Sequence, residues 1–154
     1  MKPVAVSITV DRPREEVYAH LDVLANHEAF TDHILRDWEL SGPATGVGAR
    51  VKMTVKAPGR SERVELTVIE AQEPSTIVER TVGAGGKRVT RGTYRLAEAG
   101  PGRTRVEFEI AGEAIPPAER LLNPLTRAWL RKQNARAMER LKAQLEAAPA
   151  RAAA

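Results

Sequence analysis

Most of the chain between residues 35 and 112 alternates apolar and polar positions, as half-buried β-strands do. Six such runs lie in this region, at residues 35–40, 51–55, 64–68, 77–82, 89–96 and 106–110, and a seventh lies near the N-terminus at residues 4–10. Turn residues, including Pro58-Gly59 and the stretch 99–102, separate consecutive runs. Short turns between strands that are apolar on one side are typical of an antiparallel sheet with one dry face. We therefore predict a single curved sheet of seven antiparallel strands.

Two regions depart from this period of two and follow helical spacing instead. After the first strand, Asp11 is placed to cap a helix that begins near Pro13, and residues 23–34 predict a second short helix or helical turn. Beyond Asn123-Pro124, a helix of about 20 residues carries an apolar stripe. The stripe consists of Leu125, Trp129, Leu130, Asn134, Ala137, Met138, Leu141 and Leu145. Such a helix is expected to lie on the dry face of the sheet, and a curved sheet leaves space for a hydrophobic cavity between them.

The length of 154 residues fits one domain, which we expect to span residues 1–147, with 148–154 as a frayed tail. Hydrophobic residues make up 42% and charged residues 29% of the chain, as in ordinary globular proteins. The absence of cysteine excludes disulfides, thiol nucleophiles, thiolate-bound zinc and iron–sulfur clusters. No apolar run reaches the length of a membrane span or has the form of a signal peptide, so we expect a cytoplasmic protein.

The net charge of +4 raises the alternative of a nucleic-acid partner. Much of the positive charge lies on the C-terminal helix, at Arg127, Arg131, Lys132, Arg136 and Arg140. This face could contact RNA, a ribosome or an acidic membrane. However, Glu119, Glu139 and Glu146 lie in the same region, and the aromatic residues that single-strand binders use for stacking make up only 4% of the chain. A solvated helix face is the simpler explanation, and a partner of this kind remains the less favoured alternative.

Four segments of the chain together resemble one known superfamily. They are VSITVDRPREEVYAHLDVLANHEAF at residues 6–30, GVGARVKMTV at 46–55, TYRLAEAGPGRTRVEFEI at 93–110 and PLTRAWLRKQNARAMERLKAQLE at 124–146. In this order they are similar to the START-like, or SRPBCC, superfamily with its helix-grip fold, and within it to the bacterial polyketide cyclase/dehydrase-type proteins. One departure is Phe30, which stands near the place where the family often has tryptophan.

The resemblance implies an α+β fold in which a curved seven-stranded antiparallel sheet grips the long C-terminal helix, with two short helices after the first strand. It also implies a cavity that binds a hydrophobic small molecule, such as a lipid, a polyketide or an isoprenoid-like compound. Some relatives are cyclases or other enzymes, so a cyclase/aromatase-type enzyme that uses the same cavity is the alternative function. No cofactor is expected, and the oligomeric state is left open.

Strand alternation suggests which side chains point into this cavity. If Trp38 points inward, Arg36 does too. On the fifth run, the set formed by Val78, Arg80 and Val82 is more apolar than its alternative and is therefore placed inward. We expect the ligand to contact Phe30, Trp38, Met53, Val55, Leu66, Arg80, Tyr94, Phe108, Leu125, Trp129 and Met138.

Candidate catalytic groups are few. An inward Arg80, unless a neighbouring glutamate draws it to the rim, could polarise a carbonyl or enolate oxygen, and the Tyr94 hydroxyl could orient a carbonyl. His33 could act as an acid or base at the cavity entrance. His27 and His33 are six residues apart, which does not place two imidazoles on one helix face, so no metal site is expected. We expect His20, His27 and His33 to be exposed helix and loop residues.

Overall fold

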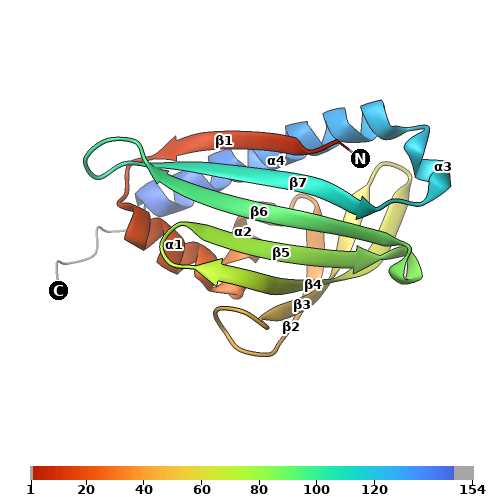
Figure 1. Ribbon diagram of the computed structural model, residues 1–154, viewed down its shortest axis with the longest axis horizontal. Helices are drawn as coiled ribbons and strands as arrows, with labels where there is room; N and C mark the ends of the chain where they lie inside the picture. The colour runs from red at the N-terminus through yellow and green to blue at the C-terminus, as the bar shows by residue number, and fades with distance from the viewer. Residues whose placement is uncertain (1, 148–154) are drawn as a thin grey trace.

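The computed structural model describes residues 2–147, which form one antiparallel sheet with a long helix packed against it (Figure 1). The strands follow the order β1-β7-β6-β5-β4-β3-β2. Their bounds are β1 Val4–Val10, β2 Leu35–Ser41, β3 Arg50–Ala57, β4 Arg60–Gln72, β5 Thr76–Gly83, β6 Arg88–Glu98 and β7 Thr104–Ala114. Strands β2 to β7 form a meander, and β1 is added beside β7. The predicted seven-stranded antiparallel sheet is confirmed.

The helices occupy the connection after β1, the β5–β6 turn and the C-terminal end. They are α1 Arg14–Asp22, the 3₁₀ turn η1 Leu24–His27, α2 Glu28–Thr31, the 3₁₀ turn η2 Ala84–Gly86, α3 Pro117–Arg120 and α4 Asn123–Ala147. This order confirms the helix-grip arrangement. The expected cap by Asp11 is wrong, because Pro13 precedes α1 without a side-chain hydrogen bond and the Asp11 carboxylate pairs with Arg103 at 2.9 Å. The predicted tail at 148–154 lies outside the described residues.

Helix α4 is buried along one half of its length and exposed along the other. Met138, Leu141 and Leu145 in its second half are buried in the core between sheet and helix. At its beginning, Leu125 is 73% exposed. The helix therefore packs tightly against the sheet only beyond its midpoint, and its first half leaves room for a cavity. Among residues 2–147, no helix is long and apolar enough to cross a membrane.

Candidate functional site

A cavity of about 560 Å³ lies between the sheet and α4. Its wall includes every residue that the sequence predicted for ligand contact except Arg80: Phe30, Trp38, Met53, Val55, Leu66, Tyr94, Phe108, Leu125, Trp129 and Met138. These side chains come from α2, from five strands of the sheet and from α4. A cavity of this size with a largely apolar wall suits a small organic ligand.

Arg80 does not line the cavity, and its expected inward orientation is wrong. The side chains of β5 that face inward include Glu79 and Thr81, which both line the cavity. Arg80 lies on the outer face of the sheet with 47% of its side chain exposed, and its Nε is 3.5 Å from a carboxylate oxygen of Glu113. The apolar pattern misled because Val78, which shares a face with Arg80, is buried on that outer face. Arg80 is therefore unavailable to a ligand in the cavity.

Strand β2 also departs from simple alternation. Its pairing with β3 is irregular between Arg36 and Glu39, and Asp37 in this interval has a positive φ of 56°. The irregularity brings both Leu35 and Trp38, three residues apart, to the cavity wall. Arg36 is consequently exposed and outside the wall, so the expectation that it follows Trp38 inward is wrong.

The three histidines occupy different environments. His27 is only 3% exposed and lines the cavity, so its expected exposure is wrong. His33 is outside the cavity wall: its Nε2 donates to the Gln133 carbonyl at 3.1 Å, and its Nδ1 accepts from Arg140 at 2.8 Å. Burial, together with the nearby charge of Arg140, lowers the pKa of His33. His20 is half-buried. Within the described part of the chain, no cluster of three or more His, Cys, Asp or Glu residues could hold a metal ion.

The Glu79–His27 pair is buried in the cavity wall. His27 Nε2 lies 2.7 Å from the Leu21 carbonyl oxygen, which can only accept, so this nitrogen carries the hydrogen. The other ring nitrogen, Nδ1, is then an acceptor, and it lies 3.3 Å from Oε1 of Glu79. Burial raises the pKa of Glu79 to about 8 and lowers that of His27 to about 4. At neutral pH both groups are therefore uncharged, with Glu79 as a carboxylic acid.

Aromatic rings pack against the His27 side of this pair. The His27 ring centroid is 5.2 Å from that of Phe30 and 5.6 Å from that of Tyr94, and Tyr94 is 4.6 Å from Phe108. Gly92 makes this packing possible, because a Cβ there would lie 3.0 Å from the Phe108 ring. Burial also raises the pKa of the Tyr94 hydroxyl, which therefore stays protonated. The result is an apolar, aromatic environment around one carboxyl group.

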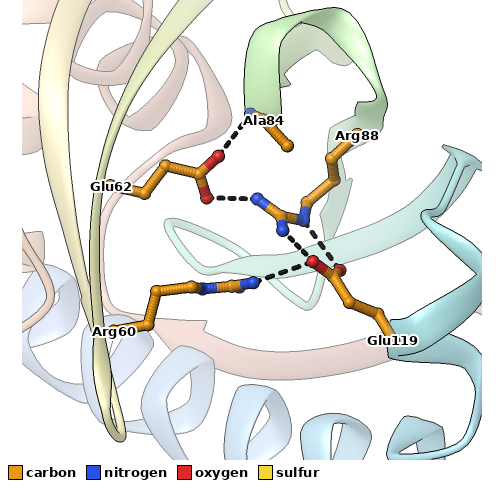
Figure 2. Close-up of polar contacts among 5 residues, drawn as sticks. All are labelled: Arg60, Glu62, Ala84, Arg88 and Glu119. Atoms are coloured by element: carbon orange, nitrogen blue, oxygen red, sulfur yellow. Dashed lines mark hydrogen bonds and ion pairs between the residues drawn. The ribbon is translucent and has the colours of Figure 1, made fainter.

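A second polar group, the Arg88 cluster, consists of Arg60, Glu62, Arg88 and Glu119 and also lines the cavity (Figure 2). Arg88 is ion-paired with both Glu62 and Glu119, and its Nε donates to Glu119 at 2.9 Å. Arg60 donates to Glu119 at 2.8 Å. The cluster connects β4, β6 and α3, and its two positive and two negative charges balance.

The basic face of α4 is partly used within the chain. Arg127 donates to the carbonyl oxygens of Lys2 and Pro3 at 3.3 and 3.2 Å. Arg140 pairs with Asp32 at 2.6 Å. These contacts attach α4 to the N-terminal segment and to the end of α2. Two of the five basic residues predicted for an RNA or membrane contact thus have structural roles.

Residues 1–146 match the sequence profile of the polyketide cyclase/dehydrase and lipid transport family. The chain belongs to this family. A comparison with curated protein sequences gave no significant match. The match to this family confirms the resemblance to SRPBCC proteins, and it supports a ligand-binding domain of this type.

Solved structures show the same fold as this family member. TTHA0849 from Thermus thermophilus is 20% identical with a TM-score of 0.75, covering 94% of this chain and 97% of that chain. The ZhuI aromatase/cyclase from Streptomyces sp. R1128 is 15% identical with a TM-score of 0.72, covering 94% and 93%. The ginseng major latex-like protein 151 from Panax ginseng is 12% identical with a TM-score of 0.66, covering 92% and 95%. At these identities the similarity establishes the fold alone.

Apart from Tyr94, the polar residues of the cavity wall, including Glu79, His27 and the Arg88 cluster, were not predicted from the sequence. Glu79 has one local signal, because it lies opposite Gly92 in the register of β5 and β6, and a glycine inside a strand often marks a close approach. His27 has no comparable signal. The Arg88 cluster joins residues from three separate elements, so no short motif could have indicated it.

Proposed function

We propose that the protein binds a hydrophobic small molecule, such as a lipid, a polyketide or an isoprenoid-like compound, in the cavity between the sheet and α4. The observation that carries this proposal is the cavity itself, about 560 Å³ with a mainly apolar and aromatic wall. A space of this size is large enough for a small organic ligand, and water in it would find few hydrogen-bonding partners. We place this activity in a single cytoplasmic domain of residues 1–147.

Filling the cavity with a larger side chain tests this proposal. Val55 lines the cavity, so V55W should lower the affinity for the neutral fluorophore N-phenyl-1-naphthylamine by at least about tenfold, since the added ring occupies the ligand's space. Val47 is 60% exposed and lies outside the cavity wall, which makes V47W the matched control. Fluorescence titration measures both affinities, and circular dichroism checks that both variants fold. Equal binding by V55W and the wild type would contradict a ligand site in this cavity.

A cyclase/aromatase-type enzyme is the second candidate, and Glu79 favours it. The protonated Glu79 carboxyl, in the same cavity wall as Tyr94, could donate a proton to a substrate oxygen. Native mass spectrometry followed by solvent extraction identifies what the purified protein carries. Incubating the extracted compound with fresh protein then separates the two candidates: a carrier returns the compound unchanged, whereas an enzyme converts it to a new product.

A further inference from the structure

We propose that Glu79 and His27 form the binding site for the ammonium group of a hydrophobic amine held in the cavity. This inference rests on the proposed binding function and specifies the chemical class of its ligand. The amine nitrogen would contact the two side chains, and the apolar part of the ligand would occupy the remaining cavity.

Once Glu79 is ionised, two hydrogen-bond acceptors face each other at this position. The Leu21 carbonyl fixes the His27 tautomer, so Nδ1 can only accept, and an ionised Glu79 can only accept as well. Their facing atoms are 3.3 Å apart, so the O–H of protonated Glu79 can donate to His27 Nδ1. Ionisation removes this donor and leaves the buried Oε1 without one among the described residues. An ammonium group offers three donors and one positive charge, which match this arrangement better than a carbonyl, which has no donor.

Glu79 also lacks a positive partner among the described residues. The titratable groups that face it are His27 from η1 and Tyr94 from β6, and neither is a cation at neutral pH. The charged residues elsewhere in the cavity wall, Arg60, Glu62, Arg88 and Glu119, pair with one another. Burial is accordingly the cause of the raised pKa of Glu79. A ligand cation would supply the positive partner that Glu79 lacks, whereas a ligand carboxylate would find no positive charge at this position.

Aromatic side chains of the cavity wall also favour a cation near the pair. The rings of Phe30 and Tyr94 contact the His27 ring, Phe108 contacts Tyr94, and all three rings line the same cavity as Glu79. Aromatic faces attract cations, most strongly where water is excluded. They therefore add to the preference for an ammonium group over a neutral hydroxyl of similar size.

The proton balance of binding follows from these protonation states. Before binding, Glu79 is a carboxylic acid, and the amine is already an ammonium ion in water below about pH 9. On binding, the Glu79 O–H bond breaks and its proton passes to solvent, which leaves a carboxylate beside the ammonium group. Binding near pH 6.5 should therefore release about one proton, and affinity should rise with pH until Glu79 is ionised in the free protein.

Three probes of equal chain length test the inference: octylamine, octanol and octanoate. Isothermal titration calorimetry at pH 8 should give an affinity for octylamine at least about tenfold above that for octanol, with octanoate the weakest. Between pH 5.5 and 7.5 the affinity for octylamine should rise by about tenfold per pH unit, whereas that for octanol should stay level. Titrations in buffers of different ionisation enthalpy measure the released proton directly.

The variant E79Q tests the role of the carboxylate. It should lower the ratio of octylamine to octanol affinity by at least about tenfold and remove the proton release, because a neutral amide cannot ionise. E113Q, a change of the same kind on the outer face of the sheet, should leave the ratio as in the wild type. The pH dependence of the wild-type protein gives the same information without relying on a variant that folds.

Each outcome is decisive. If octanol binds as tightly as octylamine, if octanoate is preferred, or if E79Q keeps the ratio, the amine site is wrong while the hydrophobic cavity still binds ligands. If none of the three probes binds and N-phenyl-1-naphthylamine does not bind either, the proposed function fails together with this inference.

Discussion

The cavity wall contains two sets of ionisable side chains, and they differ in whether they carry charge at neutral pH. In the Arg88 cluster, two arginines and two glutamates pair directly across β4, β6 and α3 (Figure 2). Pairing lowers the pKa of Glu119, which therefore stays charged. In the Glu79–His27 pair no cation is present, and burial keeps both groups neutral at pH 7. Paired charges thus fasten elements of the fold, whereas an unpaired acid remains available to a ligand.

The largest expected effect concerns the cost of ionising Glu79. Its pKa is about 8 in the folded protein and near 4.5 when unfolded, so the folded state holds a proton that the unfolded state releases between these values. The wild-type free energy of unfolding should therefore lose up to about 1.4 kcal/mol per pH unit from this residue as pH rises between 5 and 8. E79Q does not titrate, so its stability relative to the wild type should improve by about 3 kcal/mol over this range.

Urea unfolding of both proteins at pH 5, 6, 7 and 8 measures this difference. Comparing the variant with the wild type cancels the contributions of other groups, including His20 and His33, whose lowered pKa values make stability fall below about pH 6.5. E113Q is the control, because ion pairing with Arg91 lowers the pKa of Glu113 and leaves no titration between pH 5 and 8. If the difference in free energy of unfolding between E79Q and the wild type stays constant from pH 5 to 8, Glu79 does not have a raised pKa and is not a buried acid without a cation partner.

A smaller effect is expected from breaking the Arg88 cluster. R88M keeps much of the side-chain volume but leaves Glu62 and Glu119 without their main partner. Because these groups are partly exposed, with 15% of the Arg88 side chain accessible, we expect a loss of about 2 kcal/mol in the free energy of unfolding. R91M on the same strand is the control, because Arg91 pairs with Glu113 on the outer face and 45% of its side chain is exposed. Urea unfolding at pH 7 measures the loss in both variants. An equal loss would contradict the prediction that the Arg88 cluster stabilises the fold more than an ion pair on the outer face.

The sequence predicted the fold better than the polar part of the site, and the reason is physical. Alternation marks one buried face in each strand, so it indicates the sheet and most of the apolar wall, including Met53 and Phe108. It fails where both faces of a strand carry apolar residues, as on β5, where Val78 favoured the wrong set. It also fails at an irregular register, as with Arg36 on β2. The burial of His27 depends on how η1 packs against the sheet, which no local pattern encodes.

The smallest expected effect on stability concerns the Tyr94 hydroxyl, which has no hydrogen bond to any of residues 2–147. Y94F should change the free energy of unfolding by less than about 0.5 kcal/mol, since no hydrogen bond is lost. If the hydroxyl contacts the ligand instead, the affinity for octylamine should fall by about threefold to tenfold. Y18F is the control, because Tyr18 is equally buried but lies outside the cavity wall. Urea unfolding and calorimetry on both variants separate the outcomes. A stability loss above about 1 kcal/mol in Y94F alone would show that the Tyr94 hydroxyl stabilises the fold. Reduced octylamine binding without a stability loss would show that the hydroxyl, like Glu79, contacts the ligand.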